Sequence, residues 1–406
     1  MPNETRDPAF ERAMPITWRL AAAYCIVYSG VYLIPNTSPL LVGALVDHLA
    51  LTEARAGLML TLFMGSMCLA SFALAPIISR FSYRWIAVLS IGFQLAGFAF
   101  GATGNDAPIL LTALMVSGFG TGLLFAVVNA AIAGGPRPVF VYGLATIVAS
   151  LVSAAAPIIM TAQIATDGTA GFFWMPLLLA SLTLLSASSL PHGNMAGQAV
   201  EPVAEDRGSQ LSVAQVAGLL IMLGSLVTGM FQMPFYSFAE RLLARAGHGT
   251  YAIGLIFTAV MLTAALGGAI ACLVGRHDRY RLSQLMLVTV ALAATIFLAV
   301  VSTDHWVVAV AVILESPMAM LVVALQLGVA ASLDRSGHWV AATGGALFLS
   351  WAVGPLFGGW LISSFGYASL IWTTLIGTAI ALFIYLMMAA VRVREPDRQT
   401  ILQADR

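Results

Sequence analysis

A single carboxylate stands deep inside an apolar stretch of this sequence. Glu315 lies ten residues into a run that begins near His305, and helical rise places it about 15 Å from that end. This depth is the midplane of a hydrocarbon core about 30 Å thick. Because a charge there costs at least about 2.5 kcal/mol, Glu315 is expected to face a cavity. It is therefore a candidate proton carrier or counter-charge for a cation; the alternative is a protonated acid that only stabilises helix packing.

Aromatic and amide side chains recur at intervals of four along the first apolar run. Tyr24, Tyr28, Tyr32 and Asn36 have this spacing, which keeps them on one slowly winding helix face. Phenol hydroxyls in lipid need partners, so this face is expected to line a cavity or a helix contact.

Other apolar runs carry similar mixtures of aromatic and amide groups, which suit a mostly apolar binding site with a few polar fixing groups. For each of these residues, plain packing is the alternative. The candidates are Phe125, Asn129, Phe231, Gln232, Phe235 and Tyr236.

Trp351 and three prolines complete the candidate set. Trp351 stands in the middle of a run, where its ring is able to stack on a substrate ring or cation; packing or lipid contact is the alternative. Pro35, Pro39 and Pro234 interrupt apolar runs, so we expect bends there that move as gates, or plain kinks without a gating role.

The composition indicates that lipid surrounds most of the chain. Hydrophobic residues make up 60% and charged residues 9%, with a mean hydropathy of +0.93, whereas soluble domains carry about 25% charged residues. Runs of about 20 apolar residues, enough to span a bilayer as helices, recur along the chain. We predict twelve helices, near 17–46, 54–79, 85–103, 108–133, 138–164, 171–190, 211–241, 249–274, 282–302, 305–332, 338–364 and 368–392.

One polar interval divides these helices into six and six. We predict an N-terminal bundle over 1–190, a cytoplasmic linker over 191–210, a C-terminal bundle over 211–392 and a cytoplasmic tail over 393–406. The halves echo each other. The first helix breaks at Pro35 and Pro39 and runs on to Asp47, and the seventh breaks at Pro234 and runs on to Glu240. Such repeats of six spans are typical of one transporter architecture.

The arginines predict the orientation. With the amino terminus inside, the inner side receives fifteen of the eighteen basic residues, and the outer side receives only Arg55, Arg241 and Arg245. This bias favours two cytoplasmic termini and an even number of spans. We expect a multi-pass protein of the bacterial inner (plasma) membrane.

Three glycine- and arginine-bearing motifs resemble those of the major facilitator superfamily. The loop from Ala75 to Arg84 is similar to the family's loop after helix 2, with Arg80 and Arg84 matching and Ser79 replacing its aspartate. Residues 275–281 repeat this loop, and Gly354-Pro355 with its neighbouring glycines resembles the family's helix 11 motif.

The resemblance covers essentially the whole chain and implies an all-α membrane fold of two pseudo-symmetric six-helix bundles. It also implies that helices 1, 4, 7 and 10 surround a central cavity lined by Tyr28, Tyr32 and Asn36. Arg80 and Arg84 would then belong to a gating loop.

The expected function is secondary transport by alternating access. No arginine lies deep in a span, which argues against a dedicated anion carrier and favours a small neutral, cationic or zwitterionic amphipathic substrate. Proton-coupled efflux through Glu315 is the leading hypothesis; uptake by proton symport or facilitated diffusion, and a non-transporting receptor on the same fold, are the alternatives. A lone glutamate without a partner argues against an intramembrane enzyme.

The expected partners are the substrate, protons and the lipid bilayer. With a net charge of zero, nucleic acid is not an expected partner. No cofactor or metal is expected, because the sequence has neither an ATP-binding loop nor metal-ligand spacing. The chain is expected to act as a monomer.

Overall fold

Hydrogen-bonded helices are the way an apolar chain satisfies its backbone in lipid, and every described element is a helix. The computed structural model describes residues 18–74, 81–133, 138–187, 189–190, 213–274, 281–333 and 338–404. The helices are α1 (Trp18–Leu49), α2 (Glu53–Leu74), α3 (Tyr83–Gly101), α4 (Ala107–Ala133), α5 (Pro138–Asp167), η3 (Gly168–Phe173), α6 (Trp174–Ala187), α7 (Val213–Ser237), α8 (Ala239–Arg245), α9 (Thr250–Val274), α10 (Arg281–Val301), α11 (His305–Ala331), α12 (His338–Phe365) and α13 (Ser369–Ala404).

The predicted twelve-helix membrane fold is confirmed. Eleven helical stretches of the described residues are long and apolar enough to cross a membrane. One of them, Leu144–Ala187, contains most of α5 and all of α6, joined by the 3₁₀ turn η3. Counted as two helices, it brings the number to the twelve expected from the sequence.

Three helix boundaries differ from the prediction. α1 does not break at Pro35 or Pro39 but stays helical to Leu49. Proline removes one backbone donor; Ser38 Oγ compensates at Pro39 by donating to the carbonyl of Pro35 at 2.9 Å. The seventh helix ends at Ser237, one turn after Pro234, and α8 begins separately. The last helix, α13, continues past the predicted end at 392 to Ala404.

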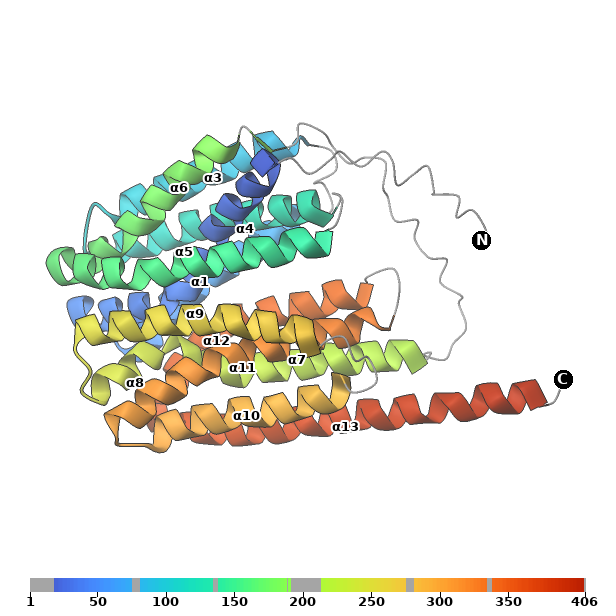
Figure 1. Ribbon diagram of the computed structural model, residues 1–406. Helices are drawn as coiled ribbons and strands as arrows, with labels where there is room; N and C mark the ends of the chain where they lie inside the picture. The colour runs from blue at the N-terminus through green and yellow to red at the C-terminus, as the bar shows by residue number, and fades with distance from the viewer. Residues whose placement is uncertain are drawn as a thin grey trace.

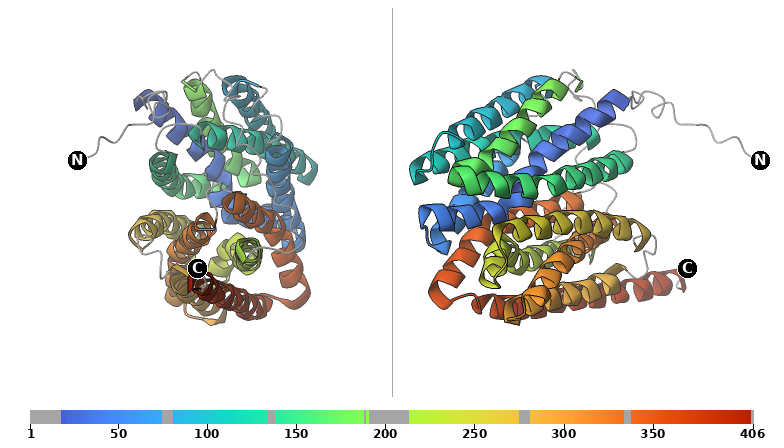
Figure 2. Two further views of the ribbon diagram at one scale, coloured as in Figure 1. Left: turned by 90° about the vertical axis from the view of Figure 1, so that its right-hand side faces the viewer. Right: turned by 60° about the vertical axis from the view of Figure 1, so that its left-hand side comes forward.

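The helices form two groups that follow the order of the chain. In Figure 1, α1 to α6 lie together in the upper half and α7 to α13 in the lower half, and Figure 2 shows the same grouping from two further sides. Across the junction, α5 packs along α9 and α2 packs along α12. The predicted linker, 191–210, lies outside the described residues, so the exact division of the chain remains a prediction.

The two groups meet most closely near the end of the molecule that carries α8, at the left of Figure 1; we call this the α8 end. Gly57 of α2 lies against the carbonyl of Pro355, and Gly359 of α12 lies against the carbonyl of Glu53. A Cβ at either glycine would collide with this backbone, so small residues are what allow the close approach.

Side-chain hydrogen bonds reinforce this contact. Ser363 Oγ accepts a 3.0 Å bond from the backbone amide of Ala54, and Thr61 Oγ1 accepts one of 3.0 Å from Leu356. The two groups of helices are therefore joined by packing and by hydrogen bonds at the α8 end.

Candidate functional site

Glu315 occupies the position on α11 that the sequence predicts. The helix begins at His305, where Asp304 caps it by accepting from the amides of Trp306 and Val307. The Glu315 side chain is 1% exposed. Its Oε1 accepts a 2.7 Å hydrogen bond from Gln232 Nε2 of α7. A buried carboxylate with a neutral amide partner can gain or lose a proton without a fixed cation beside it.

Pro317, two residues after Glu315, leaves one backbone carbonyl of α11 without its helical donor. Pro317 cannot donate to the carbonyl of Ile313, four residues earlier. Thr263 Oγ1 of α9 donates to that carbonyl at 3.1 Å. The α11 backbone beside Glu315 is thus held to α9 as well as to α7.

A second polar link leads from α7 into the first group of helices. Tyr236 lies one turn after Gln232, and its hydroxyl donates a 2.6 Å bond to the backbone carbonyl of Asn36 on α1. Its phenol is also within electrostatic range of Glu315. The Asn36 amide donates in turn to Ser153 Oγ of α5 at 3.0 Å. Residues predicted separately on α1, α7 and α11 therefore converge.

An aromatic row extends from α1 through α4 to α12. Tyr28 and Tyr32 lie 4.6 Å apart between ring centroids, and Tyr32 lies 6.2 Å from Phe125. Phe125 meets Phe348 edge-on at 4.7 Å, and Phe348 meets Trp351 at 5.5 Å. The predicted Tyr28, Tyr32, Phe125 and Trp351 thus belong to one row.

Phe348 was missed at the sequence level. It joins the Phe125 ring of the first group to the Trp351 ring of its own helix. The available signal was its position three residues before Trp351, which places both on nearly the same helix face. Asn129 lies one turn from Phe125 and donates to that residue's own carbonyl at 2.8 Å.

Two of the predicted substrate-binding residues do not join this site. Phe231 packs against Gly377 of α13, where a Cβ would meet its ring. It also lines an apolar groove of about 710 Å³ between α7, α12 and α13. Phe235 is completely buried in the hydrophobic core. Both were predicted from their distance to Pro234 along the chain, whereas the rotation of α7 directs Gln232 and Tyr236, and not Phe231, toward Glu315.

The predicted gating residues lie in three places. Pro35 and Pro39 are buried within α1, and Pro234 packs against Gly358 of α12. Arg84 is in the first turn of α3, and Arg80 lies outside the described residues.

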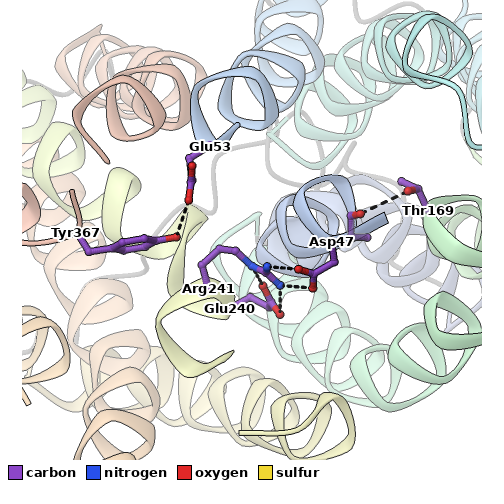
Figure 3. Close-up of polar contacts among 7 residues, drawn as sticks. Asp47, Glu53, Thr169, Glu240, Arg241 and Tyr367 are labelled. Carbon is purple, nitrogen blue, oxygen red and sulfur yellow. Dashed lines mark hydrogen bonds and ion pairs between the residues drawn. The ribbon is translucent and has the colours of Figure 1, made fainter. Parts of the chain in front are cut away.

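An ion cluster at the α8 end was not predicted, although Asp47 and Glu240 had marked equivalent ends of the two halves. Arg241 donates from Nη1 and Nη2 to the two carboxylate oxygens of Asp47 at 2.5 and 2.6 Å. It also donates from Nε and Nη2 to Glu240 at 2.5 and 2.9 Å. Figure 3 shows the guanidinium held between the two carboxylates. Burial alone would lower the pKa of Arg241, but its hydrogen bonds with Asp47 and Glu240 hold that pKa above the usual value.

A weaker contact lies beside this cluster. Tyr367, in the turn between α12 and α13, donates to Glu53 Oε1 of α2 at 3.4 Å (Figure 3). Arg245 lies over the Tyr367 ring at 4.4 Å. Burial and the neighbouring Glu53 raise the pKa of the Tyr367 phenol, so it remains a donor.

Comparison with known proteins agrees with this architecture. The family model described as Major Facilitator Superfamily matches residues 20–344. No curated protein matches the sequence.

Solved structures similar to this one include a mutant of the nucleoside transporter NupG, with a TM-score of 0.69 and 12% identity over 92% of this chain and 100% of that chain. A bacterial homologue of the human lysosomal transporter Spinster, in an inward-facing and occupied conformation, has a TM-score of 0.69 and 13% identity over 92% and 96%. A structure of proton dependent oligopeptide transporters has a TM-score of 0.66 and 12% identity over 93% and 99%. At these identities the likeness shows a shared fold alone.

Proposed function

This chain belongs to the major facilitator superfamily and is a secondary transporter rather than an enzyme, and we propose that it exports a small neutral, cationic or zwitterionic amphipathic molecule in exchange for protons. Multiple membrane spans and a small-molecule substrate follow from the family. The coupling ion, the direction and the substrate class are the proposal.

The observation that carries proton coupling is the bond between Gln232 and Glu315. Within the described spans, Glu315 is the acid at mid-membrane depth, it is 1% exposed, and its hydrogen-bond partner is an uncharged amide. An isolated charge in this setting is costly, so proton binding and release are strongly linked to how the surrounding helices pack.

One turn of α7 connects Glu315 to the junction between the two bundles. Gln232 holds Glu315 of the same bundle, and Tyr236, on the same face, holds the Asn36 carbonyl of the opposite bundle. When Glu315 takes up a proton, its new hydroxyl requires an acceptor, which the Gln232 amide oxygen supplies after reorientation. A shift of this α7 turn changes the geometry of the Tyr236–Asn36 bond. Protonation and separation of the two bundles therefore influence each other.

The aromatic row supports the substrate class. Tyr32, Phe125 and Trp351 are half-buried, and together with Phe348 they offer ring faces and edges to a flat or cationic group. Glu315 supplies the negative charge for a cationic substrate. These groups suit an amphipathic organic molecule better than an inorganic anion.

The proposed direction depends on orientation. The arginine bias favours an orientation with the end opposite α8 in the cytoplasm and the α8 end facing outward. Uptake by proton symport is the second candidate, because one similar solved structure is that of proton dependent oligopeptide transporters.

Transport in reconstituted vesicles tests the proposal. A thermal-shift screen of organic cations, zwitterions and neutral amphiphiles on the purified protein first identifies a ligand. Its counterflow is then measured in inverted vesicles under an imposed proton gradient. We expect accumulation driven by the gradient in the wild type and none with Glu315→Gln, which keeps the shape and the Gln232 contact.

Glu53→Gln serves as the matched control, because Glu53 contacts Tyr367 and not Glu315. Undiminished gradient-driven transport in Glu315→Gln would refute the proton-coupling role. Accumulation only under the opposite gradient would favour symport, and a ligand that binds but never crosses would favour a receptor.

A further inference from the structure

Of the two ion pairs in the cluster at the α8 end, only one joins the two bundles. Asp47 lies on α1 of the first bundle, while Glu240 and Arg241 are neighbours on α8 of the second. The Asp47–Arg241 pair therefore breaks when the bundles part at this end, whereas the Glu240–Arg241 pair travels as a unit. Two carboxylates that look equivalent around one guanidinium thus have different fates on opening (Figure 3).

The three side chains also differ in burial. The Arg241 and Glu240 side chains are each 10% exposed, whereas that of Asp47 is 58% exposed. A buried arginine that loses its partner carries a large penalty, whereas a half-exposed aspartate returns to water easily. Separation of Asp47 from Arg241 is therefore limited mainly by what happens to the arginine.

The backbone of α1 covers Glu240. Its carboxylate lies directly against Gly43, where a Cβ would collide with both the carboxyl carbon and oxygens. This burial raises the pKa of Glu240 above its ordinary value despite the adjacent Arg241. When α1 moves away, water reaches the carboxylate, so the ionised form of Glu240 is better accommodated in the open state.

We propose that Glu240 is an exchange partner for Arg241, which takes up the whole guanidinium as Asp47 leaves and so makes the α8 end easier to open. Asp47 is the latch of this end, and Glu240 is its release. The inference rests on the alternating opening proposed above, but not on proton coupling, the substrate or the direction of transport.

This assignment predicts opposite effects from two substitutions, each of which removes one negative charge beside Arg241. Asp47→Asn weakens the contact that crosses the bundles and favours the open α8 end. Glu240→Gln leaves Arg241 dependent on Asp47 and removes the buried charge from the closed state, so it favours the closed end. Each change shifts the ratio of open to closed molecules by about tenfold, in opposite directions.

Distance measurements between spin labels test this directly. Labels at Asp106→Cys and Thr303→Cys, both exposed at the α8 end and in opposite bundles, report its opening by double electron–electron resonance in lipid nanodiscs. The native Cys25, Cys68 and Cys272 are replaced by serine. Glu240→Asp, which keeps the charge, restores wild-type behaviour if charge is what matters. Asp167→Asn, an exposed acid at the same end, is the matched control.

Shifts of Asp47→Asn and Glu240→Gln in the same direction would overturn the exchange role and make Glu240 a second latch. An unchanged distance distribution in Asp47→Asn would overturn the latch itself. A single short distance in every variant would overturn the opening on which both proposals rest. Opposite shifts combined with full coupled transport in Glu315→Gln would support the latch and refute only the proton-coupling proposal.

Discussion

The hydroxyl of Tyr236 donates a 2.6 Å hydrogen bond to the backbone carbonyl of Asn36, a residue 200 positions earlier in the chain. One turn away on the same helix, Gln232 holds the buried carboxylate of Glu315. A single turn of α7 therefore contacts both the candidate proton site and the opposite bundle. These two hydrogen bonds connect a protonation event at Glu315 to the junction of the two bundles.

Removing the Tyr236 hydroxyl isolates this link. We expect Tyr236→Phe to favour opening of the α8 end, because a hydrogen bond worth about 1 kcal/mol between the bundles is lost. The Asp106–Thr303 label pair measures the shift, expected to be about fivefold. Tyr251→Phe, on an exposed phenol of α9, is the control. An unchanged open population in Tyr236→Phe would show that this bond does not restrain the junction.

The aromatic row and Phe231 make separate predictions. Phe125→Leu and Phe348→Leu should each raise the KM for transport several-fold, because they remove rings from the row, with little change in thermal stability. Phe231→Leu should instead lower the Tm and leave KM unchanged, because its ring packs on Gly377 of α13. Transport kinetics and thermal unfolding measured on the same preparations separate the two effects. A raised KM in Phe231→Leu alone would reverse this assignment.

Substitution of Gly43 tests whether α1 packs directly on the Glu240 carboxylate. Gly43→Ala should open the α8 end or lower the Tm, because the added methyl group occupies the space of the Glu240 carboxylate. Gly65→Ala on α2 is the matched control. Apart from its own helix backbone, no described atom lies within 4 Å of its added Cβ, and alanine is the better helix former by about 1 kcal/mol. Equal behaviour of the two variants would show that Glu240 does not pack on α1 in the membrane.

The ionisation of Glu240 predicts how the α8 end responds to pH. Burial raises the pKa of Glu240 in the closed state, so the closed state binds a proton more tightly than the open one. Lowering the pH toward the ordinary glutamate pKa of about 4.3 should therefore favour closure, and this effect should disappear at pH values above the raised pKa.

The charged and titratable groups around Glu240 are Arg241 beside it and Asp47 on α1, with His48 next to Asp47. Tyr367 lies near Arg241 and is itself contacted by Glu53 and Arg245. The label distance is measured against pH in wild type and in Glu240→Gln, which should lose the closure on acidification. A response that is identical in both proteins would show that Glu240 is not the group responsible.

The sequence by itself determined the class of the protein, the number of helices and the position of Glu315 ten residues into its helix. These follow from hydropathy and helical rise, which are local properties of a chain in lipid. The four-residue spacing of Tyr28 and Tyr32 also indicated their neighbouring positions, and their rings and hydroxyls do meet. The effect of the prolines on helix ends was less predictable. The helix α1 continues through Pro35 and Pro39, whereas α7 ends one turn after Pro234.

Only the tertiary structure decided which faces meet. The pairing of Asp47 with Arg241, the place of Phe348 in the aromatic row and the turning of Phe231 toward α13 all depend on how each helix is rotated against its neighbours. That rotation is set by close contacts such as those of Gly57 and Gly359 with backbone carbonyls of the facing helix. In an apolar helix surrounded by lipid, hydrophobicity distinguishes one face from another only weakly, so packing and a few hydrogen bonds determine the orientation.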